Sequence, residues 1–244
     1  MSGSAVGCIS YFQPTQIPNL KLWLDGFDPN ANGKVPSDGV MTKWTDKSAS
    51  NNSVTQVIGA SQPMYNSSLK CASFNGSSQF LAGSMTHSPL GNQNWTIAAV
   101  HNLDTTINRT FVSVLIGTIP VSSPFNRALA LGTNGLMPSD PYVIAAWDGV
   151  ESNVGTMVPN TTAAVMGVYT TLPSAQVFTP TLTGPLSTVG NAIDITSNQV
   201  AIGSSTFSNR WDGNIFEVLI YNREVSTEQR LALFNYLTKK WNLS

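Results

Sequence analysis

The sequence predicts an all-β protein, an antiparallel β-sandwich that closes with one short α-helix. Runs rich in β-branched and aromatic residues recur from residue 20 to residue 222, and Gly, Pro, Asn and Ser fill the spacers between them. Regular short strands separated by turn residues are typical of antiparallel sandwiches and barrels rather than of βαβ units. Helical periodicity follows only after Ser226.

The chain is expected to hold one domain, residues 20–244, after a short N-terminal segment. Residues 1–19 lack periodicity and contain Pro14 and Pro18, so we expect an arm or an edge strand there. No linker-like change of composition interrupts the rest. The expected strands are Leu20–Asp25, Val40–Thr45, Ala72–Asn75, Gln79–Ala82, Trp95–His101, Thr110–Thr118, Arg127–Gly132, Tyr142–Trp147, Ala163–Thr171, Ala175–Thr181, Gln199–Gly203 and Ile215–Asn222.

The C-terminal segment has the clearest local signals. Asp212-Gly213 is a turn pair that opens the last strand, and that strand stops at Asn222. Ser226 and Gln229 have the spacing of a capping box, which predicts that a helix begins there. Large apolar residues then recur on one helix face, namely Leu233, Phe234, Leu237 and Trp241. The chain is therefore expected to end in a buried strand covered by an amphipathic helix.

Motifs at both ends of the chain carry a family resemblance. They are Leu22-Trp23-Leu24-Asp25, then Trp44-Thr45-Asp46-Lys47-Ser48 with Asn51, Gln56 and Pro63, then Ser73-Phe74-Asn75-Gly76-Ser77-Ser78-Gln79-Phe80-Leu81. With the C-terminal strand and helix, they resemble the laminin-G-like, concanavalin A-like lectin–glucanase jelly-roll domains of phage, viral and bacterial surface proteins. The resemblance covers roughly residues 20–82 and 210–243. It implies a jelly-roll β-sandwich and does not specify a function.

The low charge of the chain excludes several kinds of partner. Charged residues make up 10% of the sequence and the net charge is −1, so no basic field attracts nucleic acid. No apolar stretch has the length of a membrane span, and the N-terminus lacks the features of a secretory signal. With the resemblance, this favours a virion surface, and an extracellular or bacterial cell-surface location is the alternative. Cys8 and Cys71 are expected to be buried free thiols.

The distribution of carboxylates argues against an enzyme. A retaining glycosidase needs two carboxyl groups about 5–5.5 Å apart, which one strand supplies at positions i and i+2 or i+4. No glutamate has a second carboxylate at that spacing within a strand; the glutamates are Glu151, Glu217, Glu224 and Glu228. His87 and His101 belong to no serine-hydrolase or zinc motif. The protein is therefore predicted to be non-catalytic.

Two segments combine a tryptophan with short polar residues, as a sugar site requires. Aromatic faces stack on the apolar side of a pyranose, and amides and carboxylates bond its hydroxyls. The first segment offers Trp147, Asp148 and Asn153, and the second offers Asn209, Trp211 and Asp212. The structural alternative is that each tryptophan plugs the end of the sandwich and that Asp-Gly is a hairpin turn. Trp23, Trp44 and Trp241 are assigned to the core.

One loop has half of the pattern of a calcium site. Asp28, Asn30 and Asn32, followed by Gly33, place oxygen ligands at alternate positions before a glycine turn. The glutamate expected at the twelfth position is replaced by Gly39. A polar turn is the favoured interpretation, and no cofactor other than this calcium ion is expected.

These observations leave two main hypotheses. The first is a lectin-like recognition or adhesion module that binds a glycan or a host-surface receptor through rim loops. The second is a structural virion protein whose partners are other virion proteins or further copies of itself. A glycan-active hydrolase or lyase is a third hypothesis, which the carboxylates disfavour.

Overall fold

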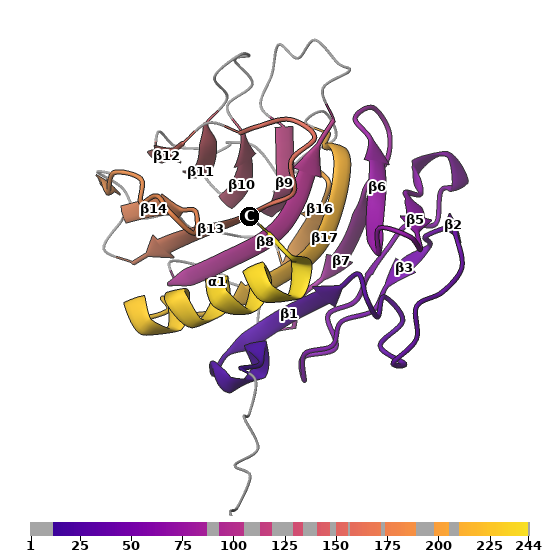
Figure 1. Cartoon of the computed structure of the whole chain (residues 1–244), viewed down its shortest axis with the longest axis horizontal. Coiled ribbons are helices and arrows are strands. Elements are labelled where there is room, and N and C mark those ends of the chain that lie inside the picture. The colour runs from indigo at the N-terminus through magenta and orange to yellow at the C-terminus, as the bar shows by residue number, and fades with distance from the viewer. Residues whose placement is uncertain are drawn as a thin grey trace, which may run out of the picture.

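The structure is a computed structural model of the whole chain. It describes residues 12–86, 93–104, 113–118, 129–133, 141–146, 150–155, 157–171, 174–188, 198–204 and 210–243. Within these residues the strands form two antiparallel sheets that pack face to face, and the helix α1 (Thr227–Trp241) lies across the outer face of one of them (Figure 1). This architecture confirms the predicted all-β jelly-roll sandwich with one C-terminal helix.

The two sheets contain the following strands. In the sheet that carries the helix, β15 (Ser187–Thr188), β14 (Ser174–Phe178), β13 (Ala163–Thr170), β8 (Trp95–Leu103), β17 (Asp212–Tyr221), β6 (Cys71–Asn75), β5 (Met64–Asn66) and β2 (Gly39–Val40) follow one another, and β1 (Leu20–Asp25) also pairs with β17. In the opposite sheet the order is β12 (Val150–Val154), β11 (Tyr142–Ala146), β10 (Leu129–Thr133), β9 (Ser113–Thr118), β16 (Gln199–Ile202), β7 (Leu81–Ser84), β4 (Val54–Thr55) and β3 (Lys43–Trp44). The described residues also contain two 3-10 turns, η1 (Pro14–Gln16) and η2 (Gly59–Ser61).

Strand β8 shows why the central strands are apolar on both faces. Trp95, Ile97 and Ala99 point into the core between the sheets, whereas Ala98 and Val100 point into a second core beneath α1. Successive residues of a strand face opposite sides, so a strand covered on both sides loses the usual alternation of apolar and polar residues. The same holds for β17, which is buried along almost its whole length.

Several expected elements differ from the observed ones. The expected strand Val40–Thr45 is two short strands, β2 and β3, which belong to opposite sheets. The chain crosses the edge of the sandwich between them, where Met41 bonds Pro63 and Gln56 bonds Thr42 through backbone groups. Four short strands carry too little apolar periodicity to be found in the sequence; they are β4, β5, β12 and β15.

The pair Asp212-Gly213 is not a turn, because it forms the first two residues of β17. Gly213 has a φ of 131°, and a Cβ atom there would lie 2.3 Å from the carbonyl oxygen of Asn102. Glycine is therefore required by the close approach of β8, not by a hairpin. In the N-terminal segment, the described residues 12–19 contain the turn η1 and no strand, and Ile17 is buried beneath α1.

The tryptophan–aspartate motif of the family resemblance holds β1 to the following loop. The Asp46 carboxylate accepts hydrogen bonds from the backbone N–H groups of Trp23 (2.8 Å), Ser48 (2.8 Å) and Asn52 (2.7 Å), and from the Ser48 hydroxyl (2.7 Å). Asn52, the neighbour of the motif residue Asn51, is buried. Both oxygens of the Asp46 carboxylate are thus occupied by hydrogen bonds within the fold.

Helix α1 begins as predicted. The Ser226 hydroxyl accepts a hydrogen bond from the backbone N–H of Gln229 (3.3 Å), and the Gln229 side chain accepts one from the backbone N–H of Ser226 (3.0 Å). Leu233, Phe234 and Leu237 are buried against the sheet. No described helix has the length and apolar character needed to cross a membrane.

A buried carboxylate on β17 fastens the end of this helix to the sheet. Glu217 is 0% exposed and accepts hydrogen bonds from Trp23 (2.8 Å), Tyr236 (2.8 Å) and Trp241 (2.6 Å), while the Lys240 ammonium lies 2.9 Å away. We call these five residues the Glu217 cluster. Burial raises the pKa of the Glu217 carboxyl, and the Lys240 charge partly offsets that rise. A carboxylate buried in this way stabilises the fold only while its donors remain in place.

The charge of Lys240 is shared with a second carboxylate. Lys240 lies 2.8 Å from one oxygen of Asp25, and Lys47 lies 2.8 Å from the other. Burial alone would raise the pKa of Asp25, but the two ammonium groups lower it below its usual value. Ion pairs thus connect α1, through Lys240, to Asp25 of β1, and connect Asp25 to Lys47 in the loop after β3.

Candidate functional site

The first predicted sugar segment lies mostly outside the described residues. Trp147 and Asp148 are not among them, and neither is Asn209 of the second segment. Asn153 lies in β12, opposite Val143 of β11. The prediction that these residues share a site therefore falls outside the described part of the chain.

Trp211 and Asp212 are buried. Trp211 is 0% exposed in the core between the sheets, and its ring packs edge-on against His101 with centroids 5.2 Å apart. Asp212 is also buried and pairs with Asn75 of β6. A sugar needs an accessible aromatic face, so the predicted glycan contact does not fit the position of Trp211. Its position agrees with the structural alternative, a tryptophan that fills the sandwich.

The possible calcium loop is held by its own hydrogen bonds. One oxygen of the Asp28 carboxylate accepts the backbone N–H groups of Asn32 (2.8 Å) and Gly33 (2.9 Å), and the other lies 3.2 Å from the Lys47 ammonium. Asn32 accepts the backbone N–H of Lys34 (3.0 Å), and Asn30 is exposed. Within the described residues no group of three His, Cys, Asp or Glu residues could hold a metal ion. Asp28, Asn30 and Asn32 therefore form a polar turn.

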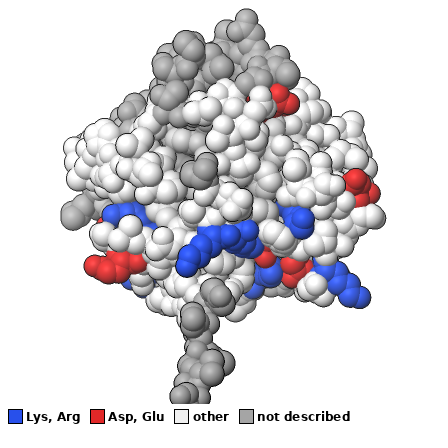
Figure 2. Space-filling model, viewed as in Figure 1, with Lys and Arg blue, Asp and Glu red and all other residues white. Residues whose placement is uncertain are grey.

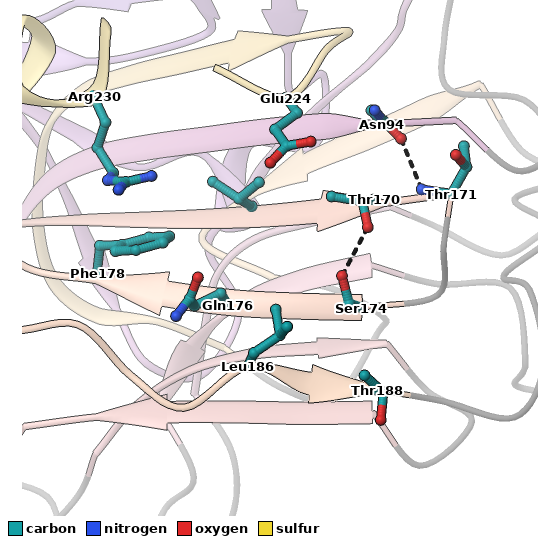
Figure 3. Close-up of a pocket in the computed structure, with 11 residues that line it drawn as sticks. Asn94, Thr170, Thr171, Ser174, Gln176, Phe178, Leu186, Thr188, Glu224 and Arg230 are labelled. Atoms are coloured by element: carbon teal, nitrogen blue, oxygen red, sulfur yellow. Dashed lines mark hydrogen bonds between the residues drawn. The ribbon is translucent and has the colours of Figure 1, made fainter. Parts of the chain in front are cut away.

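A groove lies where α1 leaves part of the sheet uncovered. Its volume is about 650 Å³, and its floor is the outer face of β13, β14 and β15 (Figure 3). Glu224, just before the helix, and Arg230, in its first turns, form one wall. The groove is within the usual size range of small-ligand sites. Most charged side chains in the view of Figure 2 lie in a band along the helix and the loops beside it, and the surface above is nearly uncharged.

Arg230 defines the closed end of this groove. Its guanidinium carbon lies 3.9 Å from the centre of the Phe178 ring, and one of its nitrogens donates to the Thr227 hydroxyl (3.3 Å). Burial lowers the pKa of Arg230, and the nearby Glu224 and Glu228 charges act in the opposite direction. The stacked guanidinium is fixed in place, and its remaining N–H groups are available to a ligand.

Polar groups with spare hydrogen-bonding capacity face the groove. Glu224 is exposed and its carboxylate makes no hydrogen bond with any described residue. Asn94 uses only its oxygen, which accepts from the backbone of Thr171 (2.7 Å). Gln176 uses only its nitrogen, which donates to Gly184 (2.8 Å). One carboxylate, one amide nitrogen and one amide oxygen are thus left for a ligand.

Hydroxyls and apolar side chains complete the floor. The hydroxyls of Thr170 and Ser174 lie 2.7 Å apart across neighbouring strands. Val168 and Leu186 contribute apolar surface to the groove, and Leu186 is exposed. Alternating small apolar patches and hydrogen-bonding groups match the two faces of a sugar ring.

The described lining of the groove contains few carboxyl groups. Glu224 is the one carboxylate among the described residues that line it. Glycosidases use two carboxyl groups on either side of the scissile bond. The described lining therefore does not supply a pair of carboxyl groups.

Sequence reasoning did not find this groove. In the sequence, Glu224 close to the helix start fits the helix dipole, and Arg230 resembles an ordinary helix surface residue. A signal was nevertheless present in β14, where Ser174 and Gln176 alternate with apolar residues, although a strand under a helix should be apolar on that face. Polar outward positions on β14 indicate that something other than α1 faces them.

The fold and groove define a two-sheet β-sandwich with a ligand-sized groove on its helix-bearing face. No protein-family model and no curated protein sequence matches the chain.

Among solved structures, the chain is similar to two botulinum neurotoxins. It matches the binding domain of serotype D with a TM-score of 0.61 at 11% identity, covering 89% of this chain and 50% of that one. It matches a type C neurotoxin structure with a TM-score of 0.56 at 12% identity, covering 90% and 51%. Cell entry of that type C toxin depends on interaction with two ganglioside molecules.

The chain is also similar to the sialidase of Trypanosoma rangeli, with a TM-score of 0.60 at 14% identity, covering 92% of this chain and 33% of that one. It thus spans about half the length of the toxin chains and a third of the sialidase. At these identities the likeness establishes the β-sandwich fold and nothing finer.

Proposed function

We propose that this protein is a non-catalytic, lectin-like recognition module that binds a glycan in the groove formed by β13, β14, β15 and the start of α1. The observation that carries the proposal is the exposed Glu224 carboxylate, which has no partner among the described residues and faces the same groove as the fixed guanidinium of Arg230. The ganglioside dependence of the similar neurotoxin supports it as an analogy of fold.

The chemistry of the groove suits a neutral, hydroxyl-rich ligand. Glu224 and Arg230 contribute opposite charges, so a ligand of either sign would meet repulsion as well as attraction. A pair of adjacent sugar hydroxyls can donate to a carboxylate and accept from a guanidinium at once. The spare groups of Asn94 and Gln176 add one donor and one acceptor.

The motifs around Trp44 and Ser73–Leu81 support membership in the laminin-G-like, concanavalin A-like class, with residues 20–244 as one domain. The last strand, β17, pairs with β1, β6 and β8, so both halves of the chain contribute to one sheet. We place the protein at a virion or phage surface, where the glycan would belong to a host receptor. An extracellular or bacterial cell-surface protein is the alternative location.

A glycan array tests the proposal. The unmodified protein and the variant Glu224→Ala are probed side by side, with Lys239→Ala on an exposed position of α1 as the control. We expect the unmodified protein and Lys239→Ala to bind the same glycans and Glu224→Ala to bind them at least tenfold more weakly. Binding to no glycan, or equal binding by all three proteins, would contradict the proposal.

A second candidate function is a structural role in a virion. Four apolar side chains near one edge of the sandwich are exposed, with Val57 89% exposed. The others are Val40, Ile58 and Met64, of which Val40 and Met64 are direct neighbours across β2 and β5. Exposed apolar side chains gathered in one region are typical of protein–protein contacts. Light scattering with Val57→Ser and Met64→Ser tests this: self-association that these changes abolish would support a structural role.

A further inference from the structure

A second, smaller pocket opens at the other end of β13. It has a volume of about 210 Å³ and is lined by the start of β13, the turn after β14 and the first residue of β11. Leu243, just beyond α1, forms part of its rim. The pocket shares one strand with the groove but no lining residue.

Tyr142 gives this pocket an unusual feature. Its side chain is 5% exposed and lines the pocket, yet its hydroxyl makes no hydrogen bond with any described residue. The ring itself packs against His101 and is fixed there. The hydroxyl can therefore still donate a hydrogen bond to a ligand in the pocket.

The remaining walls are neutral and of mixed polarity. No described residue of the lining carries a charge. Thr162 and Thr181 add hydroxyl groups without a described hydrogen-bond partner, whereas Pro180, Leu182 and Leu243 are apolar. A charged ligand would lose its hydration without gaining a counter-ion here, which disfavours it.

We propose that this pocket binds a small neutral acetamido group, as carried by an N-acetylated hexosamine. The amide oxygen would accept the hydrogen bond of Tyr142, and the methyl group would lie against Leu182 and Pro180. The pocket is below the size of a drug-like site, which suits one small group rather than a whole oligosaccharide. This site is separate from the groove and does not depend on it.

Amide NMR spectra of the full chain, titrated with N-acetyl-D-glucosamine and in parallel with D-glucose, test the proposal. We expect N-acetyl-D-glucosamine to shift resonances of residues 157–163 and 179–182, and D-glucose, which lacks the acetamido group, not to shift them. Tyr142→Phe should weaken binding about three- to tenfold, and Thr181→Val about threefold. Thr181 is exposed, so its change also serves as a variant that keeps the fold.

Binding of N-acetyl-D-glucosamine in the pocket should not depend on the groove. Glu224→Gln should leave the N-acetyl-D-glucosamine shifts of the pocket unchanged, so failure of one site does not affect the other. Equal shifts from D-glucose, no shifts at the pocket, or unchanged affinity in both Tyr142→Phe and Thr181→Val would overturn the proposal.

Discussion

The guanidinium of Arg230 lies 3.9 Å from the centre of the Phe178 ring. This contact joins the first turns of α1 to β14 and covers the aromatic face that a sugar would otherwise use. In the proposed function, a glycan would therefore meet the edge of a fixed guanidinium and not an aromatic platform.

We predict that Arg230→Lys fails to replace Arg230. Lysine keeps the positive charge but loses the planar donor fork and much of the stacking on Phe178. Affinity for a glycan identified on the array should fall at least fivefold by titration calorimetry, a loss of about 1 kcal/mol. Equal affinity in Arg230→Lys would show that charge alone matters and would exclude a role for the fork.

Removing the charge of Glu217 should destabilise the whole fold. In Glu217→Gln the amide cannot accept all the hydrogen bonds that the carboxylate accepts, and the Lys240 ammonium loses a buried counter-charge. Breaking a buried ion pair in this way lowers the free energy of unfolding by about 3–5 kcal/mol. Urea unfolding measures this loss. In a double-mutant cycle, Glu217→Gln with Lys240→Met should cost less than the sum of the two single changes by at least about 1 kcal/mol. Additive effects would show that the Glu217–Lys240 contact at 2.9 Å is not energetically coupled.

His101 should make the protein sensitive to acid. It is 1% exposed, neither ring nitrogen has a described partner, and burial lowers its pKa from 6.5 to about 3. Below pH 6.5 the His101 imidazole therefore takes up a proton in the unfolded chain but stays neutral in the folded protein. The free energy of unfolding consequently falls by up to about 1.4 kcal/mol per pH unit.

Unfolding free energies measured at pH 7.5 and pH 5 test this. In His101→Phe the loss between the two pH values should be about 2 kcal/mol smaller than in the unmodified protein, because the titrating group is gone. Comparing the two proteins cancels the contribution of other titrating groups. The same loss in both would show that His101 is not the acid-sensitive residue.

Gly213→Ala should cost about 2–4 kcal/mol of stability. A Cβ atom would lie 2.3 Å from the Asn102 carbonyl oxygen, at a φ of 131° that other residues rarely adopt. Gly39→Ala, where a Cβ meets nothing within 4 Å, is the matched control and should change stability by less than about 1 kcal/mol. Similar thermal shifts in both variants would disprove this account of Gly213.

The sequence predicts those structural features that one residue type produces by itself. Ser226 and Gln229 form the predicted capping box, and Trp44 fills the core as expected. The Asp46 motif follows from a single carboxylate that gathers nearby backbone donors. The capping box and the Asp46 contacts to Ser48 and Asn52 involve residues close together in the chain, so the sequence contains their signal.

The groove depends on distant segments, and the sequence could not reveal it. Glu224 and Arg230 meet β13, β14 and β15 only because α1 folds back over the sheet. Trp211 was misjudged for the opposite reason: a tryptophan beside Asn and Asp looks exposed in the sequence, but the strand that follows carries it into the core. Both outcomes depend on contacts between segments that are distant in the sequence.

The most direct test of glycan binding in the groove compares two neighbouring glutamates. Glu224 lines the groove, whereas Glu228 lies outside it and accepts a hydrogen bond from the Ser226 hydroxyl (2.7 Å). Titration calorimetry with the best glycan from the array should show at least a tenfold loss of affinity for Glu224→Gln and a change of less than twofold for Glu228→Gln. Full affinity in Glu224→Gln, or equal losses in both variants, would contradict the assignment of the groove as the glycan site.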